Sequence, residues 1–285
     1  MTFSKFRWSL AWGVLIVMAW SAPALAVPVL FSQGGGSIQT TVDSFRTALG
    51  SPNNGNNPGG RREINWDGGT ATDGTPAVTP FTVFQNTRGA TFTTPGSGLT
   101  QAPIVGGTVD IAPGLAGVQG SLSALNATYA TAFTTFSPNR LFVPLDSTIT
   151  DGFFSVPGTG GAAPATVAGF GAVFTDVDLA NTSSLQFFDT QGNSLGTFFV
   201  PTGGTANGSL SFLGVIFTTE RIGRVRITSG NTALGATEGA GVDVVAMDDF
   251  LYSEPRAIPE PAGLTLLGMG ALALGLLARG RKRQA

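Results

Sequence analysis

The second half of the chain alternates short apolar runs with gaps rich in glycine, asparagine and serine. Each run is strand-length and contains β-branched or aromatic residues, and no helical crossover separates consecutive runs, so we expect antiparallel pairing. The pattern predicts a mainly β protein built as an antiparallel β-sandwich of the jelly-roll-like kind. The runs cover residues 141–143, 149–156, 167–174, 185–188, 195–200, 210–217, 222–227 and 242–252.

The clearest hairpin signal lies within residues 184–200. Two apolar runs flank Thr190, Gln191, Gly192 and Asn193. Glycine and asparagine tolerate the positive φ that tight turns require. We therefore predict a strand, a tight turn and a returning strand.

The first half of the chain opens with a helical periodicity. Ile38, Val42, Phe45 and Leu49 recur at spacings of four, three and four residues, which places them on one face of a helix. Gly50 and the following serine and proline end the pattern. The sequence predicts one short helix that packs on a sheet.

Shorter strand signals follow this helix. Ile64 and Trp66 alternate with polar neighbours, which predicts that both point inward. Residues 81–84 and 90–93 are short β-branched and aromatic runs and predict two more strands. Residues 98–138 contain few strong strand formers, and we assign no element there.

The amino-terminal residues have the three parts of a secretory signal peptide. Lys5 and Arg7 precede an apolar run at residues 10–20, and Ala24 and Ala26 supply the small residues of a cleavage site. We predict a signal helix that the Sec machinery exports and signal peptidase removes. An uncleaved amino-terminal anchor is the alternative interpretation.

The carboxy-terminal residues combine a proline pair, an apolar segment and a basic cluster. Residues 262–278 carry no charge. As a transmembrane helix they would extend about 25 Å, the short end of what crosses a bilayer core of roughly 30 Å. Prolines stop the helix on one side and cations favour the cytoplasm on the other, as in an ordinary membrane anchor. The flanking residues are Pro259, Glu260 and Pro261, then Arg279, Arg281, Lys282 and Arg283.

The fixed order of these features resembles the PEP-CTERM sorting signal of Gram-negative bacteria. The resemblance covers residues 258–285 and implies recognition by exosortase, a membrane cysteine protease and transpeptidase. The apolar helix would then anchor the chain only transiently in the inner membrane, before sorting to the cell envelope or the extracellular space. Hosts of this family commonly carry exopolysaccharide synthesis loci, which implies exopolysaccharide as a further partner.

Removing residues 1–26 and 258–285 leaves a body of residues 27–257. This body contains nine arginines, no lysine and sixteen Asp and Glu residues, which gives a net charge of −7. An acidic surface without a basic patch repels phosphate backbones, so we expect no nucleic-acid partner.

The chain contains neither histidine nor cysteine. Their absence excludes Ser-His-Asp and Cys-His catalysis and zinc sites built from His or Cys. It also means that no disulfide stabilises an exported body, which must be held by its core with or without help from a metal.

Acidic residues near two predicted strand ends suggest a calcium site. Asp176 and Asp178 follow one strand, and Asp248 and Asp249 lie near the end of the last. Calcium takes six to eight oxygen ligands, and alternating aspartates with turn carbonyls supply several of them. The alternative is that these residues cap a turn and line a solvated strand edge, because no EF-hand loop pattern is present.

The aromatic residues best suited to stacking on a sugar ring are Trp66, Tyr129 and Tyr252. Trp66 is the strongest candidate, although a tryptophan beside Ile64 in a strand is more often a core residue. Both interpretations stay open from the sequence alone.

An enzyme with this composition would most simply be a glycosidase that uses two carboxylates, with Glu63, Asp67, Glu220 and Glu238 available. No motif surrounds any of them, and we expect no enzymatic activity. Two hypotheses remain: a structural or adhesive extracellular protein associated with exopolysaccharide, and a carbohydrate-binding module.

Overall fold

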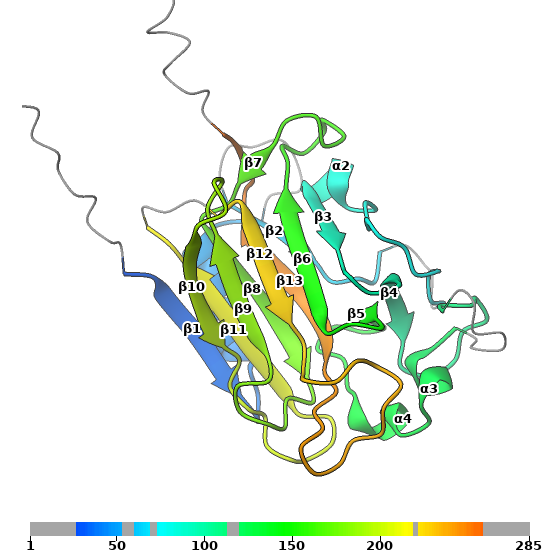
Figure 1. Ribbon diagram of the computed structural model, residues 1–285. Coiled ribbons are helices and arrows are strands. Elements are labelled where there is room, and N and C mark those ends of the chain that lie inside the picture. Colours follow the sequence, from blue (N-terminus) through cyan, green and yellow to red (C-terminus); the bar gives the residue numbers. More distant parts are fainter. Residues whose placement is uncertain (1–26, 53–59, 69–72, 113–119, 219–221, 259–285) are drawn as a thin grey trace, which may run out of the picture.

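A computed structural model of the chain describes residues 27–52, 60–68, 73–112, 120–218 and 222–258 (Figure 1). The predicted signal peptide with Ala24 and Ala26 and the predicted sorting segment from Pro259 onward, including residues 262–278, lie outside the described residues. Among the helices that are described, none combines the length and hydrophobicity needed to cross a bilayer. The described part is mainly β with antiparallel strand pairs, as the sequence predicts.

Two antiparallel sheets face each other across a common core (Figure 1). The larger sheet consists of β1 (Val29–Gly34), β11 (Leu210–Ile216), β8 (Gly169–Thr175), β13 (Ala246–Ser253), β5 (Arg140–Leu145) and β4 (Gly98–Pro103), with β2 (Arg61–Ile64) beside the far end of β13. The smaller sheet consists of β10 (Ser194–Phe199), β9 (Ser184–Phe188), β12 (Arg224–Thr228), β6 (Ile149–Phe154) and β3 (Ala90–Thr93). A separate ribbon pairs β7 (Ala165–Thr166) with β14 (Arg256–Ala257).

Eight strands follow one pairing rule, and they correspond to the eight apolar runs of the sequence. Taken in chain order, the first pairs with the last and so on inward: β5 with β13, β6 with β12, β8 with β11, and β9 with β10. This part of the chain is therefore one long hairpin whose four strand pairs are shared between the two sheets.

The innermost turn of this long hairpin is the tight turn predicted within residues 184–200, which the structure confirms. Asp189 Oδ1 accepts hydrogen bonds from the backbone N–H groups of Gln191 at 2.9 Å and Asn193 at 2.8 Å. Gly192 adopts φ 85°, a left-handed conformation that glycine reaches without strain. A local sequence signal thus fixes the centre of the fold.

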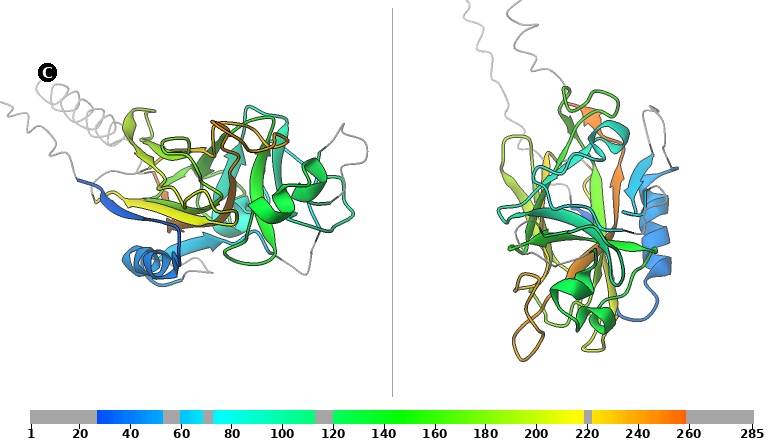
Figure 2. Two further views of the ribbon diagram at one scale, coloured as in Figure 1. Left: turned by 90° about the horizontal axis from the view of Figure 1, so that it is seen from below. Right: turned by 90° about the vertical axis from the view of Figure 1, so that its right-hand side faces the viewer.

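The predicted short helix is confirmed as α1 (Gln39–Leu49), which lies against the outer face of the larger sheet (Figure 2). Val42, Phe45 and Leu49 are buried, as their spacing predicts. The Phe45 ring lies over Gly171 and Gly214, which face each other in neighbouring strands. A Cβ atom at either glycine would approach that ring to 2.8 Å or less, so the helix requires glycine at both positions.

Aromatic side chains fill the space between the sheets. Trp66 is fully buried and its ring stacks on Phe142, with centroids 3.8 Å apart and ring planes within 1° of parallel. Phe92 and Phe250 meet the same indole edge-on at 5.7 and 4.9 Å. Such pairs are favourable beyond the area they bury. Ile64 is buried as well, so the inward alternation predicted for Ile64 and Trp66 is confirmed.

Two stretches differ from the sequence-based expectation. The strand predicted at residues 81–84 is wrong, because only Phe81 forms an isolated bridge, to Phe92, before α2 (Gln85–Arg88) begins. Residues 98–138, left unassigned, contain β4, α3 (Leu122–Leu125) and α4 (Tyr129–Ala132). Strand β4 is made of weak strand formers but is buried along its whole length, so tertiary packing overrides its intrinsic propensity.

Candidate metal centre

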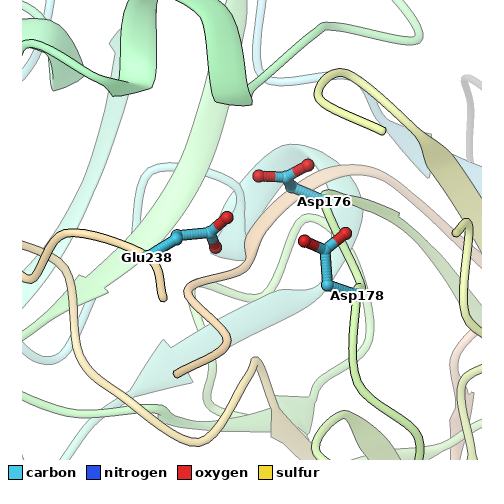
Figure 3. A group of neighbouring side chains, drawn as sticks. All are labelled: Asp176, Asp178 and Glu238. Carbon is cyan, nitrogen blue, oxygen red and sulfur yellow. The ribbon is translucent and has the colours of Figure 1, made fainter. Parts of the chain in front are cut away.

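Three carboxylates from two distant segments meet beside the end of β8. Asp176 and Asp178 follow that strand, and Glu238 comes from the loop that joins β12 to β13. One carboxylate oxygen of each residue lies within 4.8 Å of the other two, and we call this group the carboxylate cluster (Figure 3). Like charges this close repel, most strongly at the buried Asp176, which favours a shared proton or a cation.

Asp176 is the fully buried member of the cluster. Neither of its carboxylate oxygens accepts a hydrogen bond from any described residue. Its backbone adopts φ 69° and donates its N–H to Ser209 O at 2.9 Å, which holds the side chain in place. Burying a carboxylate without donors is costly, so both oxygens of Asp176 are left for a proton or a ligand.

A fourth carboxylate, that of Asp243, holds the loops around the cluster. It is fully buried and accepts hydrogen bonds from the backbone N–H of Asp178 at 3.0 Å and from the Thr182 hydroxyl. One oxygen of Glu238 accepts the backbone N–H of Val244 at 2.9 Å. These contacts leave the second Glu238 oxygen and the Asp178 carboxylate facing Asp176 (Figure 3).

The electrostatics of the cluster favour neutral or metal-bound carboxyl groups. Burial, reinforced by the charges of Glu238 and Asp178, raises the pKa of Asp176 to about 8. Burial also raises the pKa of Asp178, with Asp243 adding to the effect. The pKa of Glu238 is raised chiefly by burial. Strongly perturbed pKa values grouped in one place are typical of functional sites.

An all-oxygen donor set selects hard cations. Calcium accepts carboxylate, carbonyl and water oxygens in a flexible geometry, whereas zinc sites normally use sulfur and nitrogen ligands that this chain cannot provide. Asp176, Asp178 and Glu238 would hold the ion, and backbone carbonyls and water would complete the coordination. The donor chemistry of the cluster therefore fits calcium.

Asp248, predicted to join Asp176 and Asp178, is not part of the cluster. Strand β13 bulges between Met247 and Phe250, and this bulge places the Asp248 carboxylate against the 136–137 backbone. There it accepts the N–H of Phe136 at 2.6 Å and of Ser137 at 3.3 Å. Burial and the adjacent Asp249 raise the pKa of Asp248. The structure thus brings two of the three predicted residues together and places the third elsewhere.

Glu238 is the third member of the cluster, although the sequence indicates it only as one of four carboxylates available to a glycosidase. The Tyr129 hydroxyl donates to Ala236 O and accepts the N–H of Gly235, both at 2.7 Å. Tyr129 therefore anchors the loop that delivers Glu238. No local sequence pattern indicates this contact, because its partners lie 106 and 107 residues apart along the chain.

The aromatic residues proposed for sugar stacking are all core residues. Trp66, Tyr129 and Tyr252 are fully buried, so none presents a ring face to a glycan. The Trp66 indole N–H donates to Asp248 O at 3.0 Å, and the Tyr252 hydroxyl donates to Arg88 O at 3.0 Å. Buried Tyr and Trp usually find such partners. The stacking role predicted for Trp66 is wrong, and the core interpretation holds.

Among the described residues, the catalytic candidates Glu63 and Asp67 are held by other protein groups. Asp67 accepts the backbone N–H groups of Asn139 and Arg140, at 2.5 and 2.8 Å, and so serves the local backbone. Glu63 is paired with two arginines. Glu220 lies outside the described residues, and Glu238 belongs to the carboxylate cluster.

Comparison with known proteins finds no matching family model, no similar curated protein and no similar solved structure. We therefore infer the chemistry of the cluster from the side chains of this chain alone. The feature that most directly indicates a ligand is the buried carboxylate of Asp176, which has no hydrogen-bond donor among the described residues.

The raised pKa of Asp176 predicts a specific pH dependence of stability without metal. Between a value of about 4 for an unfolded aspartate and about 8 in the fold, the folded state keeps a proton that the unfolded state has released. The free energy of unfolding must therefore fall as pH rises through this window. We expect Asp176→Asn to reduce that fall and to exceed the parent in stability at pH 8.

Urea unfolding at pH 5 and pH 8 in the presence of a chelator measures this difference. Asp146→Asn, at an exposed position, is the matched control and should keep the pH dependence of the parent. Equal pH dependence in the parent and in Asp176→Asn would show that the Asp176 carboxylate is not strained in the fold.

Proposed function

We propose that this chain is an exported protein of the cell envelope or extracellular matrix, sorted by an exosortase-type enzyme through residues 258–285. The observation that carries the sorting proposal is the order of three tail features: the Pro259-Glu260-Pro261 motif, an uncharged segment and a terminal basic cluster. An amino-terminal signal pattern supports export by the Sec machinery and removal of that pattern by signal peptidase. The role we assign to the body is structural or adhesive, in association with exopolysaccharide.

We further propose that the body is a jelly-roll sandwich. Support comes from its pairing rule, in which one long hairpin is rolled so that β5, β13, β8 and β11 share one sheet and β6, β12, β9 and β10 the other. This arrangement closes a core without helical crossovers. Strands β1 to β4 and helix α1 extend or cover the roll.

Calcium binding is the molecular property that the geometry supports best. The single observation that carries it is the fully buried Asp176 carboxylate, which faces Asp178 and Glu238 without a donor. A divalent cation would offset most of the negative charge of the cluster and hold the end of β8 to the loop before β13. An exported body without disulfides gains stability from such a link.

A structural or adhesive role is favoured over the two alternatives. The carbohydrate-module hypothesis loses its sugar-stacking residue, because Trp66 is in the core. The glycosidase hypothesis loses two of its four candidates, since Glu63 and Asp67 are held by arginines and backbone N–H groups. We therefore prefer a structural or adhesive role for the body.

The open side of the two sheets supports assembly. Among the described strands, β1 pairs only with β11 and β10 only with β9, and neither edge strand contains a charged residue. Leu30 is 51% exposed and Phe199 is 53% exposed on these edges. Uncharged exposed edges favour pairing with another strand, which charged edge residues normally prevent.

The calcium proposal predicts a ligand-dependent melting temperature. At a site with a Kd of about 10 μM, millimolar calcium adds about 2.7 kcal/mol to the free energy of unfolding. For a domain of this size the gain corresponds to a melting temperature roughly 5–10 °C higher than in chelator. Calorimetry should show this rise in melting temperature for the parent and for Asp146→Asn. Asp176→Asn should show none. Identical melting of the parent in calcium and in chelator would refute calcium binding.

The sorting proposal predicts a defined carboxy terminus. Mass spectrometry of the protein exported from cells with active exosortase should show an end near Pro259. The double variant Pro259→Ala, Pro261→Ala should retain the tail, because the prolines keep the motif extended and outside the membrane helix. Recovery of the parent with its intact terminus at Ala285 would instead support a permanent anchor.

A further inference from the structure

A polar cavity of about 430 Å³ lies between α1, β2, α2 and the bulge of β13. Three of the nine arginines of the body, Arg46, Arg61 and Arg88, line it together with Glu63 and Asp249. The cavity does not include the carboxylate cluster. Such a concentration of guanidinium groups is notable in a body whose net charge is −7.

The carboxylate oxygens that line the cavity already accept hydrogen bonds from the protein. Glu63 Oε1 accepts from Arg61 Nε at 2.5 Å, and Glu63 Oε2 accepts from Arg46 at 3.0 Å. Asp249 Oδ1 accepts from the Ser137 hydroxyl at 2.6 Å, and Asp249 Oδ2 accepts from Arg46 at 3.3 Å. No carboxylate oxygen of these two residues is left without a donor.

Donor atoms, in contrast, remain unused. Arg88 donates from Nε to Glu63 O at 3.2 Å, but its two terminal nitrogens form no hydrogen bond or ion pair with any described residue. Arg61 uses Nε and Nη1, and its Nη2 likewise has no partner among the described residues. The exposed Asn65 amide lies at the rim. The cavity therefore offers unused guanidinium donors; three arginines and two carboxylates line it, and Asp43 pairs with Arg46 beside it.

We propose that this cavity binds the carboxylate of an acidic sugar, with the Arg88 guanidinium as its principal partner. A guanidinium fork matches a planar carboxylate in two parallel hydrogen bonds. Unused donors around the cavity, with its carboxylate oxygens already occupied, select an acceptor-rich anionic ligand over a cationic one. The choice of a uronate over other carboxylates rests on the proposed role in an extracellular matrix. The anion site itself rests only on the residues that line the cavity.

Titration calorimetry with trigalacturonate tests the site on the full chain in detergent. A calcium-free buffer with chelator is required, so that calcium at the carboxylate cluster cannot bridge protein and sugar. We expect saturable binding that weakens with added salt, and no binding of neutral galactotriose. Inorganic phosphate distinguishes a sugar site from a general anion site. Weaker binding of phosphate supports a sugar site, and equal binding of phosphate would overturn the sugar assignment.

Matched variants connect the binding to the cavity. Arg88→Gln should weaken trigalacturonate binding by about tenfold or more, because a charge-assisted pair is lost. Arg256→Gln, which removes the same charge at an exposed position of β14, should leave the affinity within about twofold, since it only alters screened long-range attraction. Asn65→Asp adds a negative charge at the rim, which repels an anionic ligand. This variant should also weaken binding, without removing a side-chain contact of the fold.

The inference fails if trigalacturonate does not bind at millimolar concentration, or if Arg88→Gln and Arg256→Gln lose affinity equally. Circular dichroism of each variant confirms that the fold is intact. Calcium-dependent melting and tail processing measured on the parent separate this failure from failure of the proposed function, because neither depends on Arg88.

Discussion

The fold depends on Trp66, which links the core between the sheets to the strand at the centre of the larger sheet. Its ring stacks on Phe142 of β5, and its indole N–H is bonded to Asp248 O in the bulge of β13. Strand β13 in turn pairs with β8, and Asp176 directly follows β8. Aromatic packing, the β13 bulge and the carboxylate cluster therefore form one connected arrangement, which must hold without disulfides.

Burial of charge is the second constraint. Buried carboxylates in this body occur in two settings that follow different rules. Asp243, Asp248 and Asp249 have backbone, hydroxyl or arginine donors, which offset the loss of water. Asp176 has none among the described residues. Either a proton shared with Glu238 or a bound cation would satisfy this carboxylate, and calcium is the one that we propose.

The parts of the structure that sequence predicts well are those set by local pattern. Helix α1, the hairpin with its Gly192 turn and the eight strand runs each follow from spacing within about a dozen residues. The predictions failed where tertiary contact decides. Asp248 leaves the cluster because of a bulge, and Glu238 enters it because Tyr129 anchors a distant loop.

Trp66 shows the same limit of prediction from local sequence. Its alternation with Ile64 correctly predicts an inward position, yet residue type alone also fits a sugar platform. Only the fold shows that Phe142, Phe92 and Phe250 already occupy its faces and edges. Chemistry-bearing residues can be identified from sequence, but their neighbours depend on which strands pair.

A crystal structure grown at neutral pH with calcium tests the central claim most directly. Calcium binding predicts a density peak among Asp176, Asp178 and Glu238, with metal–oxygen distances of about 2.3–2.6 Å. A structure without an ion, in which Asp176 and Glu238 instead share a proton at an oxygen–oxygen distance of roughly 2.5–2.7 Å, would contradict it.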